Sequence, residues 1–296
     1  MNIYVGSGMC DNARRLELFR GSVFVHAPCP SALKLCQLAR ELIEEAFGNV
    51  DPLKVHETLA VERCVEILSV LKPRFIHHPD SKEFIKGILA ELNCDLEKTY
   101  FDVPRMRTAF PNDYLKSGIA YAFHPHRDTW YSAPFCQVNW WMPIYSLNSE
   151  NCMAIHPSYW DRPVRNGSSQ YNYYQWNRES RNNAAQHVKT DTRTQPKPEE
   201  PMELDPQIRL VCDVGGAYQF SAAHMHSTVP NSSPLTRYSI DFRTVHLDDI
   251  WGRIGAPNVD SACTGTTMRD YLRGADLSHL PDPAIDMYDE GALAAV

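Results

Sequence analysis

Two short patterns in the sequence combine side chain types that bind metal ions. They are His126-Arg127-Asp128 and, 98 residues after its aspartate, a segment that begins His226-Ser227-Thr228. In an extended segment, residues two apart point to the same side, so His126 and Asp128 can offer a nitrogen and a carboxylate oxygen to one ion. Taken alone, this pair is common by chance and would indicate only a surface turn.

An arginine extends the second pattern. Arg237 follows His226 by eleven residues, after a turn rich in Pro, Asn and Ser. We expect one strand to end at His226 and the next to begin at Arg237, so that both side chains project into one cavity from neighbouring strands. Two imidazoles and one carboxylate can hold Fe(II) by one face and leave three positions open. A nearby arginine can bind a dicarboxylate through two parallel hydrogen bonds.

With Asn231 included, these residues resemble the Fe(II)/2-oxoglutarate-dependent oxygenases, specifically the phytanoyl-CoA dioxygenase-like branch. Members of that branch show H-x-D, then a pattern close to H-[GS]-[ST]-x-x-N, with an arginine eleven residues past the distal histidine. The resemblance covers roughly residues 100–246. It implies a double-stranded β-helix (jelly-roll) core, Fe(II), 2-oxoglutarate as cosubstrate and O2. The iron ligands that it implies are His126, Asp128 and His226.

The resemblance also implies residues that bind the cosubstrate. Arg237 matches the partner of the distal carboxylate of 2-oxoglutarate, and Thr228 matches a hydroxyl that supports it. Trp141 lies where the branch often places an aromatic side chain beside the cosubstrate. Gln137 and Asn139 share its face of a predicted strand and are expected to contact cosubstrate or substrate.

That predicted strand, Phe135–Ile144, has two different faces. One face is apolar throughout and should pack against the core; it consists of Cys136, Val138, Trp140, Met142 and Ile144. The other carries Gln137, Asn139 and Trp141. Polar residues on a strand away from the sheet edge usually line a cavity, whereas a solvent-exposed face would more often carry Lys, Glu or Thr.

Some assignments have competitors. His224 and His124 each precede a proposed ligand by two residues, but His224 would stand thirteen residues from Arg237, and His124 has no aspartate two residues later. Arg243 is the second candidate for the cosubstrate carboxylate, with contact to substrate or to Asp241 as its other possible roles. We assign substrate contacts to four residues near the site: Arg127, Trp130, Tyr131 and Arg243.

The reaction expected from the resemblance is oxidation of a C–H bond with release of succinate and CO2. Halogenating members of the superfamily replace the carboxylate ligand by Ala or Gly, so Asp128 favours hydroxylation. We expect the substrate to be a small polar metabolite of specialised biosynthesis. Aromatic side chains in the region after Trp130 would pack against it. The alternatives are a non-catalytic jelly-roll binding protein and a metal-dependent cupin-like isomerase, neither of which needs Arg237 at its spacing.

The elements that must position these residues change type along the chain. Helical periodicity predicts a helix that Ser31 can cap and Gly48 can end, and further helices over Val55–Leu71 and over Ser81–Leu92. From about residue 100 the period is two. The predicted strands are Tyr100–Val103, Arg105–Phe110, Gly118–Asp128, Phe135–Ile144, Cys152–His156, Ile208–Val214, Ala217–His226 and Arg237–His246.

This order predicts a mainly β, α+β fold in a single domain over residues 1–296. Residues 1–98 would form a helical N-terminal layer, 99–250 the jelly-roll catalytic core, and 251–296 a loop-rich C-terminal segment. A Pro/Glu-rich loop is expected over 182–206.

Composition excludes several classes of protein. The 296 residues are 43% hydrophobic and 22% charged, as in an ordinary globular chain, and the net charge of −7 argues against a nucleic-acid partner. The 21 uncharged residues between Asp128 and Glu150 contain amides and prolines, so we expect no membrane span.

Nine cysteines without a C-x-x-C pair, and a start unlike a signal peptide, predict a cytoplasmic protein. No feature of the sequence indicates an oligomeric state.

Overall fold

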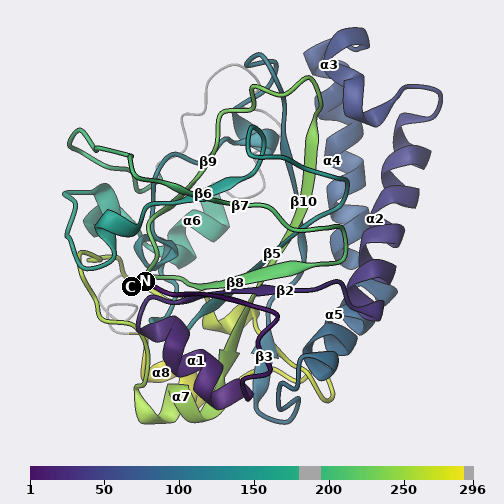
Figure 1. Cartoon of the computed structure of the whole chain (residues 1–296). Coiled ribbons are helices and arrows are strands. Elements are labelled where there is room, and N and C mark those ends of the chain that lie inside the picture. Colours follow the sequence, from purple (N-terminus) through teal and green to yellow (C-terminus); the bar gives the residue numbers. More distant parts are fainter. Residues whose placement is uncertain (180–194, 290–296) are drawn as a thin grey trace.

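The computed structural model describes residues 1–179 and 195–289 (Figure 1). This part of the chain combines helices with an eight-stranded sheet and a second, three-stranded sheet. The fold is therefore a mixture of helix and mainly antiparallel sheet. The predicted loop over 182–206 lies partly outside the described residues.

Helices dominate the first third of the chain. Five precede residue 92: α1 Asp11–Phe19, α2 Pro30–Phe47, α3 Val55–Thr58, α4 Val61–His77 and α5 Pro79–Glu91. Three shorter ones follow the first strands of the core: α6 Tyr173–Glu179, α7 Leu247–Gly252 and α8 Asp282–Asp286.

Helix α2 shows how the local sequence sets these boundaries. Pro30 occupies its first turn, where a missing N–H costs nothing, and Gly48 ends it with φ of 60°, which a side chain would disfavour. The predicted end is confirmed, but the predicted cap is wrong. Cys29 holds the N-cap position, and the Ser31 hydroxyl instead donates to Glu91 of α5 at 2.7 Å.

The helix expected over Val55–Leu71 is two helices. Helix α3 ends at Thr58, and Ala60, in an extended conformation, is the N-cap of α4, which then continues to His77. Apolar periodicity continues across the break, so it could not reveal the change of direction. Packing of α4 against the strands decides its length.

The strands form two sheets. The large sheet contains β1 Ile3–Val5, β2 Val23–His26, β3 Thr99–Phe101, β4 Arg105–Ala109, β5 Val138–Pro143, β8 Ala217–Ser221, β10 Arg237–His246 and β11 Leu272–Arg273. Its order is β1-β2-β8-β5-β10-β3-β11. Strand β4 lies off this path and pairs with residues 237–241 of β10, next to the part of β10 that pairs with β3. The small sheet has the order β7-β6-β9, with β6 Met153–Ile155, β7 Ile208–Leu210 and β9 His226–Thr228.

Three strand predictions need correction. The N-terminal layer is not only helical, because β1 and β2 extend the large sheet through pairing of β2 with β8. Residues 118–128 form no continuous strand: a 3-10 turn at Gly118–Ala120 precedes a single bridge at His126. The strand expected over Ala217–His226 breaks after Ser221, and His226 begins β9 in the other sheet. These segments are too short for periodicity to resolve.

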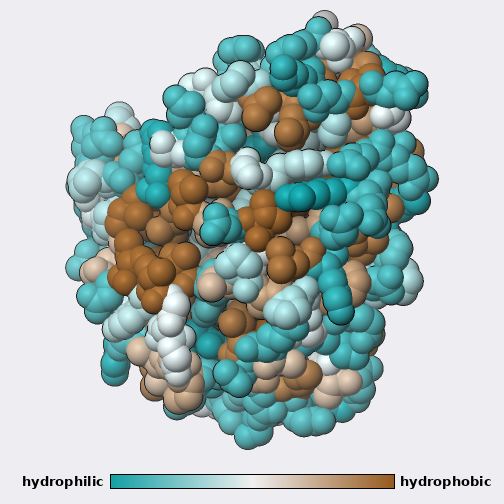
Figure 2. Space-filling view, turned by 45° about the vertical axis from the view of Figure 1, so that its right-hand side comes forward, coloured by the Kyte–Doolittle hydropathy of each residue, from teal (hydrophilic) through white to brown (hydrophobic). Residues whose placement is uncertain are grey.

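Strand β10 has the predicted bounds and separates two environments. Tyr238, Ile240 and Phe242 are buried in the core that also contains residues of α2, α4 and α5, and these helices lie along that side of the sheet (Figure 1). Asp241 and Arg243 face the other way, opposite Trp141 and Asn139 of β5. The two-faced pattern predicted for β5 is therefore confirmed. The outward surface around the helices is largely hydrophilic (Figure 2).

The 21-residue uncharged stretch belongs to this core. It contains β5, all six residues of which are buried, and a 3-10 turn, η3, at Asp128–Tyr131. Among the residues that the model describes, no helix combines the length and apolar character needed to cross a membrane.

A buried lysine joins the helical layer to the segment that leads to the site. Lys72 of α4 is 9% exposed, and its ammonium donates to the Thr108 hydroxyl and to the Ile119 carbonyl. Burial lowers the pKa of Lys72 from 10.5 to about 7. Because burial disfavours the charged form, this ammonium opposes folding at neutral pH.

We therefore predict a pH-dependent stability difference between the wild type and Lys72→Met. Between pH 7 and 10.5 the unfolded chain binds more protons at Lys72 than the folded chain, so the wild type gains stability as pH rises. Its free energy of unfolding should increase relative to that of Lys72→Met by about 1.4 kcal/mol per pH unit near pH 8–9. Denaturant titrations at pH 7, 8 and 9 test this, and a pH-independent difference would contradict it.

Candidate metal centre

The two histidines of the predicted site come together through a backbone bridge between distant segments. The amide of His126 donates to the carbonyl of His226 at 3.0 Å, and that of His226 donates back at 2.9 Å. Their ring centroids are 4.2 Å apart. The bridge adds the His126 segment to β9 as a further member of the small sheet.

The carboxylate of Asp128 points at the same place. Asp128 opens η3, and its amide donates to the Ala222 carbonyl at 2.9 Å, which ties it to the turn before His226. One carboxylate oxygen lies 3.4 Å from Nε2 of His126 and 3.7 Å from Nε2 of His226. One ligand atom from each of the three residues lies within 4.8 Å of the others, so the group could hold a metal ion.

Hydrogen bonds fix the tautomers of both rings. Nδ1 of His126 lies 2.8 Å from the His124 carbonyl, and Nδ1 of His226 lies 3.0 Å from the His224 carbonyl. A carbonyl only accepts, so each Nδ1 carries the hydrogen and each Nε2 presents a lone pair. Burial lowers the pKa of His226 to about 3, which keeps its ring neutral. Two lone pairs and a carboxylate oxygen then face one another, and a cation between them would remove their repulsion.

Asp128 is held by further polar side chains. Burial by itself would raise the pKa of Asp128, and the permanent positive charge of the nearby Arg243 lowers it. Its second oxygen accepts from the Gln137 amide at 3.3 Å and lies 3.8 Å from Nε of Arg243. The carboxylate is therefore ionised and oriented with one oxygen toward the histidines.

The supporting residues are themselves bonded. The Gln137 carbonyl accepts from the Tyr271 hydroxyl at 2.7 Å, and its amide donates to Asn139 at 2.8 Å. Arg243 forms ion pairs with Asp102 at 3.2 Å and Asp241 at 3.4 Å. Its guanidinium is thus committed to protein carboxylates, which argues against our second assignment of Arg243 to the cosubstrate.

The competing histidines point elsewhere. His224 is buried; its Nε2 lies 3.2 Å from the Gly21 carbonyl, and its ring packs against Trp160 with the ring centroids 4.5 Å apart and the planes tilted by 43°. Gly21 permits this packing, because a Cβ there would lie 2.7 Å from a Trp160 ring atom. Burial lowers the pKa of His224 to about 4. His124 is bonded to the Tyr121 hydroxyl and the Pro196 carbonyl.

Arg237 is a buried cation with unused hydrogen-bonding capacity. It is 6% exposed, its guanidinium lies 5.5 Å from the ring centre of Trp141, and it donates to the Cys152 carbonyl at 3.3 Å. Its buried Nε has no hydrogen-bond partner among the described residues, nor have the buried hydroxyls of Tyr218 and Ser239. Burial lowers the pKa of Arg237. A carboxylate would satisfy the charge and the free donors together.

The expected hairpin between His226 and Arg237 is wrong. His226 belongs to β9 in the small sheet, and Arg237 begins β10 in the large sheet. The two residues thus come from different sheets and not from paired strands. Thr228 lies at the end of β9, two residues from His226 and therefore on the same face.

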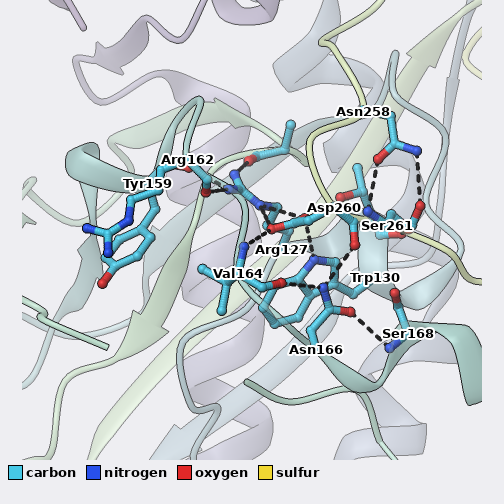
Figure 3. A network of polar contacts seen from close by, with 12 residues as sticks. Arg127, Trp130, Tyr159, Arg162, Val164, Asn166, Ser168, Asn258, Asp260 and Ser261 are labelled. Atoms are coloured by element: carbon cyan, nitrogen blue, oxygen red, sulfur yellow. Dashed lines mark hydrogen bonds and ion pairs between the residues drawn. The ribbon is translucent and has the colours of Figure 1, made fainter. Parts of the chain in front are cut away.

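Two of the expected substrate contacts are structural. Arg127 is 1% exposed and its guanidinium is bonded to Asp260 and to backbone carbonyls, while Trp130 is fully buried and donates to Asp260 at 2.7 Å (Figure 3). Both side chains are buried and bonded to protein partners. Tyr131 remains beside the site: its ring lies 5.5 Å from that of His126, and its hydroxyl donates to the Pro196 carbonyl at 2.8 Å.

Sequence reasoning missed several residues around the site. Tyr218 stacks on Trp141 at 4.9 Å, and Asp102 and Asp260 hold the two arginines nearest to Asp128. Alternation along the predicted strand at 217–226 could have placed Tyr218 on the inner face. Asp102 falls in the predicted strand Tyr100–Val103 but follows the end of β3, and Asp260 lies in an irregular segment, so alternation did not assign either residue to the site.

Comparisons with known proteins give only distant structural similarity. No protein-family model and no curated protein matches the chain. EvdO2 from Micromonospora carbonacea var. aurantiaca is 14% identical with a TM-score of 0.45, covering 83% of this chain and 94% of EvdO2. The same protein complexed with 2-oxoglutarate also gives 14% and 0.45, covering 81% of this chain and 92% of that one.

A third structure is SnoK, a non-heme alpha ketoglutarate dependent carbocyclase from nogalamycin biosynthesis. It is 13% identical with a TM-score of 0.41, covering 85% of this chain and 94% of SnoK. All three TM-scores are below 0.5.

Proposed function

We propose that this chain is an Fe(II)- and 2-oxoglutarate-dependent dioxygenase that hydroxylates a C–H bond of a small polar metabolite in specialised biosynthesis. The observation that carries the proposal is the convergence of two tautomer-fixed Nε2 atoms and one carboxylate oxygen, from His126, His226 and Asp128, within 4.8 Å. Two imidazoles and one carboxylate suit non-haem Fe(II).

The order of strand pairing supports a jelly-roll core, and the spacing of His226, Asn231 and Arg237 supports the phytanoyl-CoA dioxygenase-like branch. We count the eight core segments in chain order as β4, the His126 segment, β5, β6, β7, β8, β9 and β10. The first, eighth, third and sixth are neighbours in the large sheet, and the second, seventh, fourth and fifth in the small one. This alternation between two sheets is expected of a double-stranded β-helix. We place the core at 99–250, in a single cytoplasmic domain over 1–296.

The residues present fit both groups that this chemistry needs. His126, Asp128 and His226 would hold the metal, which supplies a site where O2 and the cosubstrate react. Arg237, with its unsatisfied Nε, would bind the distal carboxylate of 2-oxoglutarate, beside Trp141 and Thr228. Gln137 and Asn139 would hold Asp128 in place from β5. Tyr131, packed against His126, would limit the space for substrate.

Formation of succinate from 2-oxoglutarate tests the proposal. With Fe(II) and ascorbate, the wild type should release succinate and CO2, and anaerobic addition of 2-oxoglutarate to the Fe(II) protein should produce a weak visible charge-transfer absorbance. A binding protein or a cupin-like isomerase would show neither. Absence of both signals from protein that binds Fe(II) would contradict the oxygenase assignment.

A further inference from the structure

The side chain between the two proposed ligands His126 and Asp128 forms an unusually dense set of buried contacts. Arg127 is 1% exposed, and its Nε lies 3.0 Å from a carboxylate oxygen of Asp260. Its two terminal nitrogens donate to the backbone carbonyls of Ala223, Tyr159 and Arg162 (Figure 3). Each of the three guanidinium nitrogens therefore has a partner in the protein.

Asp260 gathers the other segments around this ion pair. Its side chain is 4% exposed and accepts from Trp130 Nε1 at 2.7 Å and from the Val164 amide at 3.0 Å. Its own backbone carbonyl accepts from the Asn166 side chain at 2.9 Å (Figure 3). Four acceptor contacts therefore fix a residue of the C-terminal segment against η3 and the loop at 159–168.

These contacts reach the two segments that carry the proposed metal ligands, one with His126 and Asp128 and the other with His226. Arg127 lies between two ligands in sequence, so fixing its side chain limits rotation of the backbone that carries both. The Ala223 carbonyl lies in the turn between β8 and β9, three residues before His226. The neighbouring Ala222 carbonyl accepts from the Asp128 amide. One guanidinium thus joins the segment of His126 and Asp128 to the turn that positions His226.

We propose that Arg127 and Asp260 are positioning residues of the metal centre, an ion pair that holds the three ligand side chains in register without touching the metal. This inference rests on the proposed function, because it presumes that the three residues bind a metal. A buried ion pair is weak evidence for overall stability, since apolar residues often replace one without loss. We therefore expect the ion pair to affect the positions of the metal ligands more than overall stability, because metal sites need ligands held to within about 0.5 Å.

Cobalt(II) binding to the full chain tests the proposal without requiring turnover. Asp260→Asn keeps an acceptor for Trp130 and Val164 but removes the charge that holds Arg127. It should raise the Co(II) dissociation constant about 10- to 100-fold, the usual effect of losing an outer partner of a metal site, and should alter the visible Co(II) spectrum. Asp213→Asn is the matched control: it makes the same charge change at an exposed residue before β8, which has no hydrogen bond or ion pair with Arg127 or Asp260 among the described residues. Its Co(II) affinity should match that of the wild type.

The double variant Arg127→Gln/Asp260→Asn separates positioning from folding. It leaves no unpaired buried charge, and it should weaken Co(II) binding about as much as Asp260→Asn alone, because both changes remove one interaction. If Asp260→Asn does not fold, the double variant decides the question. Thermal unfolding of the metal-free proteins is measured alongside.

Variants that unfold at lower temperature but bind Co(II) within about twofold of the wild type would overturn the positioning role. A wild type that binds no Co(II) would instead contradict the metal site itself. The two failures are therefore distinguishable.

Discussion

His226→Ala should lose Fe(II) binding and 2-oxoglutarate turnover, whereas His224→Ala should retain both. The Nε2 lone pair of His226 faces Asp128, while the ring of His224 packs between Trp160 and the Gly21 carbonyl. Loss of an outer partner already weakens metal binding about 10- to 100-fold, so loss of a ligand should raise the dissociation constant by more than about 100-fold. Asp128→Ala should behave like His226→Ala.

His224→Ala is a demanding control, because it removes a buried ring two residues away. Its stability should fall, since the ring fills space beside Trp160, but its backbone carbonyl still accepts from Nδ1 of His226. Isothermal titration with Fe(II) under anaerobic conditions, run on folded protein, measures the difference. An inactive, metal-free His224→Ala beside an active His226→Ala would reverse the assignment of the distal ligand.

Arg237→Met should weaken 2-oxoglutarate binding while leaving Fe(II) affinity nearly unchanged. Arg237 is a buried cation with an unpartnered Nε, and among the described residues no hydrogen bond or ion pair joins it to the three proposed ligands. Truncating one partner of a buried, hydrogen-bonded charge pair costs about 2–5 kcal/mol, which is about 30-fold or more in the dissociation constant. The loss should be larger than for Arg237→Lys, which keeps the charge but not the two parallel hydrogen bonds.

The second arginine of β10 provides the comparison. Arg243 lies 3.8 Å from Asp128 and forms ion pairs with Asp102 and Asp241, so Arg243→Met should change Fe(II) affinity more than 2-oxoglutarate affinity. Titrating 2-oxoglutarate by its charge-transfer absorbance at saturating Fe(II) separates the two effects. If replacing Arg243 raises the concentration of 2-oxoglutarate that is required, and replacing Arg237 does not, then Arg243 binds the cosubstrate carboxylate.

Long periodic elements could be predicted from the sequence, and short ones could not. Strand β10, whose apolar residues alternate from Tyr238 to Phe242, has the predicted bounds, and α2 ends at the predicted glycine. The sequence did not predict the break between α3 and α4 or the three-residue strand β9. A segment of a few residues contains less than one informative period. Strand β2 lies in a region of helical character and is a strand because it pairs with β8.

The sequence by itself determined which groups could do the chemistry: two histidines, one aspartate and an arginine at diagnostic spacing. It also determined that one face of β5 is polar, because alternation is a local property of the chain. Only the tertiary structure decided which way each ring points. It shows that His226 and not His224 faces Asp128, and that Arg237 lies in the large sheet while His226 lies in the small one. It also shows that Arg127 pairs with Asp260 and does not contact substrate. The reason is that such choices depend on contacts between segments far apart in sequence, which local residue patterns do not contain.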